Sequence, residues 1–352
     1  MQAKEHKMRV LILGAGGVAR AMAALLHQGG HHPQLWSPSG KGAADLAQAD
    51  LQASGALQSR FRVDLATDLP AALRAATVVV VALPANGHRR VMDLALPHLT
   101  AEHSVIVSAQ LSLGAAYLRQ ALVARGVDAT VIGWGTTVVM GRKSGPGCVQ
   151  IGGLRPAVPM AVLPKARSEA GLALCRHLFG DRFQPAPGLL AIALGNLNPP
   201  VHLANALCNL TRIENGEIWF NYNGITPAVA RLIGALDTER RAVAQAFGLS
   251  MRRVEDHFRM TFGLAEGLSL AEMAAQIHQK RGGPPGPVTL NTRFITEDVP
   301  FGIVEIITLA AAAGVAVPLH QAGLALVNAL YGARFDGQND LLPAVDLAAL
   351  TG

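Results

Sequence analysis

The stretch that decides the fold of the first half is Arg9–Leu13 (RVLIL), followed directly by Gly14–Ala19 (GAGGVA). The aliphatic run has strand length, and the alanine-rich pattern that comes next is helical until a Gly-Gly pair closes it. A strand, a glycine turn and a helix in this order are the context in which G-x-G-x-x-A indicates a dinucleotide site. The alternative is an ordinary tight turn. The context favours a nucleotide-binding α/β domain.

Each small residue of the turn has a physical role in such a site. Gly14 permits the tight turn, Gly16 lets the backbone approach a pyrophosphate, and Ala19 is small enough for the helix to pack on the strand. The helix N-terminus at Gly17 and Val18 offers free N–H groups and a partial positive charge to the phosphates. We therefore expect all five residues to contact or position the cofactor.

The cofactor is expected to be NADP rather than NAD. The second predicted strand, residues 33–36, ends without the acid that usually holds a ribose 2′-hydroxyl in NAD sites, and no acid follows before Asp45. The hydroxyls of Ser37 and Ser39 and the ammonium of Lys41 suit a 2′-phosphate, which an acid would repel. A solvated turn that happens to lack an acid is the alternative.

Strands and helices continue to alternate beyond this point. Further predicted strands are residues 61–64, 77–83, 104–108, 131–132 and 148–151. Asp68 has the place of a helix cap, Leu83 and Pro84 lie where the nicotinamide half of a cofactor would pass, and Gln110 follows the 104–108 strand as a possible substrate contact. The alternation predicts an α/β Rossmann domain with a doubly wound, mostly parallel sheet, at residues 1–187.

After a Pro-Ala-Pro-Gly linker the pattern changes to helices, which predicts an all-α second domain at residues 188–352. The expected helix signals are Asn198 as a cap before Pro199, Gly216 as a stop, a helix from Thr226-Pro227 to Phe247, a capping box at Ser269–Glu272, and Pro300 and Gly314 around a further helix.

Two segments of this second half could carry chemistry. His202 falls in the first turn of the Asn198 helix, with Asn205 and Asn209 on the same face. Residues 291–300 are expected to be extended before a helix, and place Arg293 and Asp298 together. Imidazole exchanges protons near neutral pH, arginine can hold a carboxylate by two hydrogen bonds, and aspartate can orient a histidine. A packed histidine and a helix-capping Asp298 are the alternatives.

These segments together resemble the opine (octopine/nopaline) dehydrogenase family over nearly the whole chain. The motifs that carry the resemblance are Asn198-Pro-x-x-His202, Thr211–Glu214 (TRIE), Gly224–Pro227 (GITP), Asp237–Arg240 (DTER), Thr292–Pro300 (TRFITEDVP) and Ala313–Pro318 (AGVAVP). The glycine turn alone would not separate this family from ketopantoate reductases or 6-phosphogluconate dehydrogenases. The resemblance implies a two-domain architecture like that of 6-phosphogluconate dehydrogenase.

The resemblance also implies a reaction. In this family the amine of an amino acid condenses with an α-keto acid, often pyruvate, and a nicotinamide cofactor delivers hydride to the imine. By the same resemblance His202 is the acid/base, Asp298 is its carboxylate partner, and Arg293 holds the keto acid's carboxylate. Arg142 lies near the family's loop arginine, and Asn205 is expected to reach the substrate. Because family members differ in cofactor, both NADP and NAD remain open.

Composition excludes several other functions. The net charge of +6 comes mainly from scattered arginines with no aromatic-interleaved run, which disfavours nucleic acid as a partner. The longest apolar stretches, residues 77–85 and 301–319, are too short or too interrupted to span a membrane. Three distant cysteines and histidines without ligand spacing predict no disulfide frame, no metal site and a cytoplasmic location. The apolar end of the chain makes a homodimer plausible.

Two rival functions follow from the same sequence. A ketopantoate or 2-hydroxyacid reductase generally uses a lysine in the second domain, where this chain offers only Lys280 in a predicted loop. A nucleotide-sensing protein that binds the cofactor without turnover is the other rival.

Overall fold

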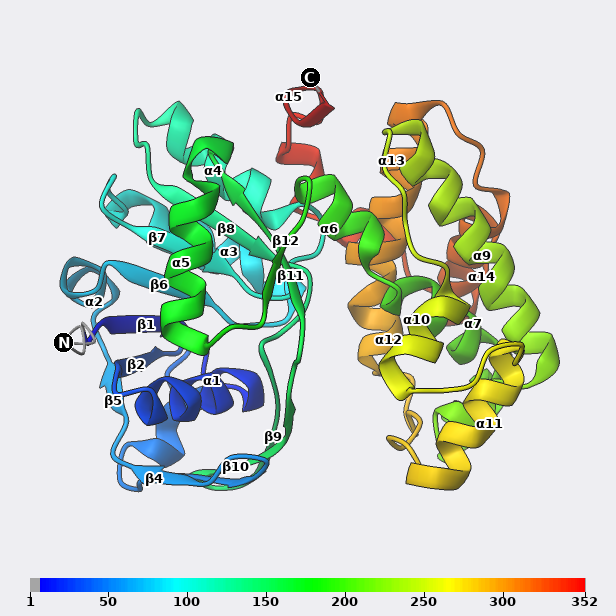
Figure 1. The fold of residues 1–352 in the computed structure, drawn as a ribbon, viewed down its shortest axis with the longest axis horizontal. Coiled ribbons are helices and arrows are strands. Elements are labelled where there is room, and N and C mark those ends of the chain that lie inside the picture. Colours follow the sequence, from blue (N-terminus) through cyan, green and yellow to red (C-terminus); the bar gives the residue numbers. More distant parts are fainter. Residues whose placement is uncertain (1–6, 352) are drawn as a thin grey trace. The chain divides into compact units, whose positions relative to one another are not determined.

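The computed structural model describes residues 7–351 (Figure 1). The chain divides into two compact units, Met1–Ile192 with Ala344–Asp346, and Ala193–Pro343 with Leu347–Gly352. The division falls within helix α6 (Leu189–Gly195), shortly after the boundary expected between residues 187 and 188. The outermost residues of the two predicted domains, 1–6 and 352, lie outside the described part.

The described part of the first unit is built on an eight-stranded sheet in the order β12-β11-β8-β7-β6-β1-β2-β5. Neighbouring strands are parallel, except that β11 runs antiparallel to β8. The strands are β1 (Arg9–Leu13), β2 (His32–Trp36), β5 (Asp64–Ala66), β6 (Val78–Val81), β7 (Ser104–Val107), β8 (Thr130–Trp134), β11 (Val158–Leu163) and β12 (Phe183–Pro185). From β5 through β1 to β8 this is the strand order of a Rossmann fold, which confirms the predicted α/β fold class.

The order of the strands reverses between β1 and β6. The chain moves from β1 to one side through β2 and β5, and then crosses to β6, β7 and β8 on the other side. Leu13 is in register with Trp36 of β2 and with Val81 of β6, so the three strands end together. Ligands of such sheets bind beyond the carboxyl ends of the strands at this reversal.

A smaller sheet with the order β4-β3-β10-β9 was not predicted. Its strands are β3 (Leu51–Gly55), β4 (Ser59–Phe61), β9 (Val139–Gly145) and β10 (Cys148–Leu154). The predicted strand at residues 61–64 is therefore wrong: β4 ends at Phe61, and β5 begins only at Asp64. The 148–151 strand exists but pairs with β9 and β3, because a short apolar run does not reveal which neighbour it will join.

Helix α1 (Gly17–Gln28) lies between strands β1 and β2 and this smaller sheet (Figure 1). A Cβ atom on Gly17 would lie 2.5 Å from the carbonyl oxygen of Gly141 in β9, so only glycine lets the strand approach the helix. The unit's remaining helices are α2 (Leu69–Ala75), α3 (His88–Ala95), α4 (Gly114–Ala124) and α5 (Ser168–Phe179), with short 3₁₀ turns η1 (Lys41–Leu46), η2 (Ala85–Gly87), η3 (Leu96–His98) and η4 (Lys165–Arg167). The predicted cap of α2 is confirmed, since Asp68 accepts from the N–H of Ala71.

The second unit is helical and has its own apolar core. Its elements are α7 (Asn198–Cys208), α8 (Leu210–Glu214), η5 (Tyr222–Gly224), α9 (Pro227–Ala246), α10 (Val254–Phe262), α11 (Leu270–Arg281), α12 (Arg293–Thr296), the π-helical turn η6 (Val299–Ile303), α13 (Val304–Ala313), α14 (Pro318–Tyr331), η7 (Asp336–Gln338), η8 (Leu342–Ala344) and α15 (Ala348–Thr351). Helix α9 is the centre, with α7, α10, α11, α13 and α14 packed against it.

Most of the predicted helix signals are confirmed. Thr226 caps α9 through the N–H of Val229, and Ser269 and Glu272 form the capping box of α11. Asn198 is not a cap, however: it is the first residue of α7, and its N–H donates instead to Oδ1 of Asn196 at 3.0 Å. None of the helices that residues 7–351 form is long and apolar enough to cross a membrane.

The expectation that residues 291–300 are extended is wrong. Thr292 caps the short helix α12, and the Thr296 hydroxyl donates to the Thr292 carbonyl at 3.0 Å. Asp298 keeps helical backbone angles and leads into the π-helical turn. The two threonines make local hydrogen bonds that favour a turn of helix over an extended chain.

Candidate functional site

The glycine turn lies at the reversal of the strand order. Gly14 has φ 141° and donates its N–H to the Trp36 carbonyl at 2.8 Å. A Cβ there would lie 2.3 Å from the carbonyl oxygen of Ala82, so only glycine fits between the ends of β2 and β6. Ala19 is fully buried under the sheet.

The space beside the next glycine is open. A Cβ on Gly16 would meet nothing within 4 Å, in contrast to Gly14 and Gly17. No side chain among the described residues caps α1, and its first turn carries no acid. The free N–H groups and the helix dipole therefore face an open space that a pyrophosphate suits, which is the fit required of a dinucleotide site.

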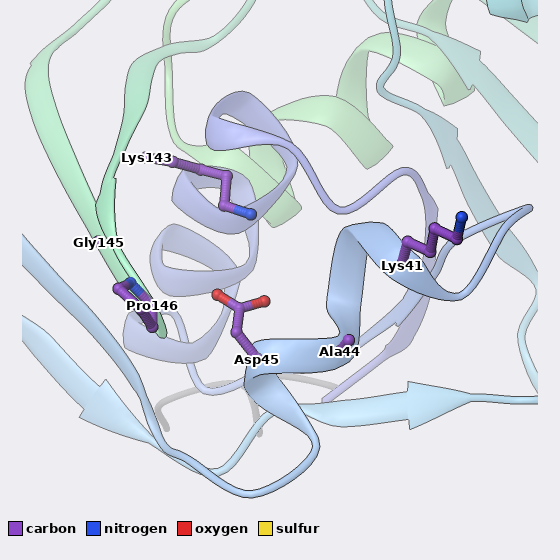
Figure 2. Close-up of a pocket in the computed structure, with 6 residues that line it drawn as sticks. All are labelled: Lys41, Ala44, Asp45, Lys143, Gly145 and Pro146. Carbon is purple, nitrogen blue, oxygen red and sulfur yellow. The ribbon is translucent and has the colours of Figure 1, made fainter.

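A pocket lies between η1 and the β9–β10 hairpin, lined by Lys41, Ala44, Asp45, Lys143, Gly145 and Pro146 (Figure 2). Lys41 and Lys143 come from opposite walls, with the Asp45 carboxylate between them. Ser37 is half-buried at the end of β2, and Ser39 is exposed. Sequence analysis missed Lys143 as a pocket residue, because only the unpredicted smaller sheet brings it beside Lys41.

Asp45 is held by an arginine rather than left for a ligand. The fully buried Arg20 forms a two-pronged pair with it, at 2.8 and 2.6 Å, and the N–H of Gly147 donates to the same carboxylate at 2.8 Å. The hydrogen bonds from Arg20 hold the pKa of Asp45 well below its usual range. Arg20 also donates to the carbonyls of Ala15 and Gly42. One buried side chain thus joins the glycine turn, η1 and the hairpin.

The loops after β6 and β7 hold the other first-unit candidates. Leu83 is half-buried, its side chain lies against Gly14, and its carbonyl bonds to Nε2 of His88 at 2.9 Å. Pro84 is exposed at the start of η2. Both residues therefore lie at the same edge of the sheet as the glycine turn, although neither shows a contact that by itself indicates a ligand.

Gln110 is buried with an unused donor. Its Oε1 accepts from the N–H of Ala115 at 3.0 Å, while its Nε2 has no hydrogen-bond partner among the described residues. The backbone around it is strained, since the non-glycine residues Ala109, Ser112 and Leu113 all have positive φ. An unpaired buried donor and stored backbone strain at a carboxyl edge are features of ligand sites.

The predicted histidine and aspartate of the second unit are joined. His202 Nδ1 and Asp298 Oδ2 are 2.8 Å apart, and Asp298 is 8% exposed. Phe294 stacks on the imidazole with ring centroids 3.7 Å apart and planes 4° apart. The Nε2 atom of His202 makes no hydrogen bond within the described chain and is not among its buried polar atoms, so it stays accessible. Asp298 makes no helix-cap hydrogen bond.

Arg293 lies one residue before that phenylalanine. Its Nε pairs with the buried Glu297, and its side chain is 71% exposed. Burial opposes the charge of the guanidinium, but the hydrogen bond that Arg293 donates to Glu297 and the nearby charge of Asp298 raise the pKa of Arg293 above its usual value. The terminal nitrogens have no partner in the described chain, which leaves the two-pronged face of the guanidinium for a carboxylate.

The two remaining predicted substrate contacts are Asn205 and Arg142. Asn205 is fully buried, and its amide bonds to Asn221 and Asn209. These contacts favour a structural role over the expected substrate contact, because the side chain's polar atoms are already used. Arg142 is exposed in β9, and its Cα lies 2.8 Å from where a Cβ on Gly17 would be. It therefore lies beside the first turn of α1, where it suits an anion.

Comparisons with known proteins match both halves of the chain. A family model described as NAD/NADP octopine/nopaline dehydrogenase, alpha-helical domain, matches residues 185–331. A second, ketopantoate reductase PanE/ApbA, matches residues 10–158. The opine dehydrogenase of Arthrobacter sp. (strain 1C) is 27% identical over 345 residues, which cover 97% of this chain and 95% of that protein.

Solved structures show the same fold. An octopine dehydrogenase in complex with NADH and agmatine has a TM-score of 0.81 at 17% identity, with 98% of both chains covered. Yersinopine dehydrogenase with NADP+ bound has a TM-score of 0.72 at 19% identity, covering 96% of this chain and 98% of that one. The helical-domain match includes the segments that hold His202 and Asp298.

Proposed function

We propose that this chain, an NAD(P)-dependent oxidoreductase similar to the opine dehydrogenases, joins the amine of an amino acid to an α-keto acid by reducing the imine between them. The observation that carries the proposal is the His202–Asp298 hydrogen bond at 2.8 Å, with Nε2 of the imidazole left accessible. This is the arrangement of an oriented acid/base that needs a substrate to complete it.

Asp298 acts on one side of the imidazole. Its carboxylate accepts the Nδ1–H of His202, so in the neutral ring the lone pair lies on Nε2. Nε2 takes a proton from the substrate ammonium, which frees the amine to attack the keto carbon. This proton and a second one, which the nitrogen loses after the attack, go to the keto oxygen, so the oxygen leaves as water and a protonated C=N bond forms. The Asp298 carboxylate stabilises the imidazolium between these two transfers.

The remaining residues bind and orient. NAD(P)H would supply, when bound, the hydride that converts the protonated C=N bond to the secondary amine. The glycine turn and the N-terminus of α1 hold the pyrophosphate, and the terminal nitrogens of Arg293 hold one carboxylate. The unused Nε2 donor of Gln110 supplies a further hydrogen bond to substrate oxygen. Arg142 is a second candidate for an anionic group.

NADP is the preferred cofactor in this proposal. Lys41 and Lys143 line one pocket next to Ser37 at the end of β2, and the acid between the lysines is neutralised by Arg20. A 2′-phosphate would therefore meet two cations and a hydroxyl without an unpaired carboxylate. A homodimer and a cytoplasmic location are further predictions that do not affect the reaction.

The test follows NADPH oxidation by absorbance with pyruvate and a panel of amino acids, with NADH in place of NADPH, and without amino acid. Oxidation that requires both substrates, with a product mass equal to their sum less one oxygen, supports the proposal. His202→Ala should lower kcat at least a hundredfold, while the exposed His32→Ala serves as the matched control.

The rivals give other results in the same assay. Oxidation with a keto acid alone indicates a ketopantoate- or 2-hydroxyacid-type reductase. The match of residues 10–158 to the ketopantoate reductase model would agree with that result. Tight cofactor binding without oxidation for any pair, unchanged in His202→Ala, indicates the sensor and contradicts the proposal.

A further inference from the structure

Phe294 stacks on His202, and the proposed reaction gives this contact no role. The phenyl and imidazole rings lie with centroids 3.7 Å apart and planes only 4° apart. This separation is within the optimal range of carbon–carbon contact, about 3.5–4.0 Å, so the two rings overlap face to face. Phe294 is half-buried, which keeps its ring against the histidine rather than in solvent.

A face-to-face stack is informative about charge. Two neutral aromatic rings prefer offset or edge-to-face arrangements, because their negative faces repel each other. A cationic ring instead gains energy above the negative face of a phenyl ring. The observed geometry therefore suits an imidazolium better than a neutral imidazole.

Helix α12 and the residue before η6 supply the two contacts of the histidine. Phe294 lies in α12, and Asp298 follows that helix directly after Glu297, at the start of the π-helical turn. Asp298 bonds to the edge of the imidazole at Nδ1, while Phe294 covers its face. The hydrogen bond alone leaves the ring free to rotate about the line from Nδ1 to Oδ2, and the stack removes that freedom.

No other charged group of the packed elements bonds to His202 in the described chain. The elements against α7 include α8, α9, α12, α14 and η6. Their charged or titratable groups have other partners or are exposed. The paired ones are Arg293 with Glu297, His320 with Glu239, Asp237 with Arg240 and Arg241, Arg212 with Glu217, and Tyr331, which donates to the Leu290 carbonyl; Arg231 and Glu214 are exposed, and η6 carries none.

We propose that Phe294 is a positioning residue, which holds the plane of the His202 imidazole. The proposal rests on the acid/base role of His202 in the proposed function. It predicts that Phe294 affects the chemical step, while substrate affinity depends on other residues.

Phe294→Leu tests this, with Phe294→Tyr as the conservative rescue. The leucine variant should lower kcat about tenfold with KM for both substrates nearly unchanged, because a less well oriented imidazole slows proton transfer but not binding. Phe294→Tyr should restore kcat. Phe61→Leu is the matched control, since Phe61 stacks on the exposed His27 at 3.9 Å and 6°.

An NMR measurement, which does not depend on catalytic activity, separates this proposal from the proposed function. In the wild type, ring current from Phe294 should shift the carbon-bound protons of the His202 imidazole upfield in NMR relative to their positions in Phe294→Leu. Unchanged shifts would overturn the positioning role even in an active enzyme. Changed signals in a protein without opine activity would keep the stack's effect on His202 and reject the reaction.

Discussion

Cofactor choice depends on single charged residues around one pocket. Lys41 and Lys143 face it from segments far apart in the chain, and Arg20 neutralises the acid between them. Sequence analysis found Lys41 from its place after the second strand but had no signal for Lys143. The reason is that Lys143 reaches the pocket only because β9 packs against α1.

Lys143→Ala should weaken NADPH binding about five- to tenfold, the loss expected for one partly exposed lysine–phosphate contact. NADH binding should stay the same, because NADH has no 2′-phosphate. Isothermal titration calorimetry with both cofactors measures the two dissociation constants, and the NADPH effect should diminish at high salt.

Lys165→Ala is the matched control, since Lys165 is an exposed lysine of the same unit that does not line the pocket. An equal loss for NADH, or none for NADPH, would contradict a 2′-phosphate in this pocket.

Among the secondary-structure elements, the π-helical turn η6 packs closely against helix α7. It follows Asp298 directly and packs on the start of α7, where His202 lies. A Cβ on Gly302 would come within 2.3 Å of Cγ and 2.8 Å of Cβ of Pro199. The close approach of η6 and α7 therefore requires glycine, and it connects the segments that hold the histidine and the aspartate. Irregular turns of this kind are common at functional sites.

Gly302→Ala should destabilise the second unit by about 1–3 kcal/mol, the usual cost of forcing an extra methyl into a packed contact. It should also lower kcat, because moving η6 away from α7 disturbs the His202–Asp298 pair. Chemical denaturation and steady-state kinetics measure the two effects.

Gly337→Ala provides the comparison, because a Cβ there meets nothing within 4 Å. If Gly302→Ala is as stable and active as Gly337→Ala, the close contact does not matter in solution.

The start of α14 contains a pH-sensitive contact. His320 is fully buried, its Nδ1 lies 2.7 Å from Glu239, and Glu239 also accepts the N–H groups of Leu319 and His320. Burial lowers the pKa of His320 below its usual 6.5, an effect that outweighs the hydrogen bond that His320 makes to Glu239. The motif Asp237–Arg240, which carried part of the family resemblance, thus anchors α14 through Glu239.

The free energy of unfolding should therefore decrease as the pH falls below about 6.5. In that range the unfolded chain takes up a proton at His320 that the folded chain does not, and each pH unit costs at most about 1.4 kcal/mol. Above pH 6.5 this contribution is fully present. Denaturation curves between pH 5 and pH 8 measure the slope.

His320→Asn keeps a donor near the position of Nδ1 and removes the titrating group. Its unfolding free energy should depend less on pH in the same range. An identical slope in both proteins would show that the sensitivity arises elsewhere.

At the scale of the whole molecule, the chain crosses between its units more than once. Each unit has a separate apolar core, and after the second unit the residues Ala344–Asp346 return to the first. The Gln120 side chain of α4 makes two hydrogen bonds with the backbone of Asp346, each 2.9 Å long. Residues Ala344–Asp346 are thus part of the cofactor-binding unit, although they follow most of the helical unit in sequence.

Gln120→Ala should speed hydrogen–deuterium exchange of the Asp346 amide about fivefold, because it removes a hydrogen bond of roughly 1 kcal/mol net. Exchange in β6 and α9 should not change. Gln321→Ala, at an exposed position of α14, is the matched control, and an unaltered Asp346 amide would mean that this contact does not hold the segment.

Taken by itself, the sequence determined the features that depend on neighbours along the chain. The Gly14–Ala19 turn, the caps at Asp68, Thr226 and Ser269, and the alternation that defines the Rossmann fold all follow from local hydrogen bonds, permitted backbone angles and periodicity. Family resemblance then predicted His202 and Asp298 as a pair, and the structure places their side chains within hydrogen-bond distance.

Only the tertiary structure decided the rest. It brought β3, β4, β9 and β10 into a second sheet, placed Lys143 opposite Lys41, and stacked Phe294 on His202. It also used the polar atoms of Asn205 within the core. These contacts join segments distant in sequence, and each depends on packing that has no local period or capping signal, so no short stretch of residues can predict them.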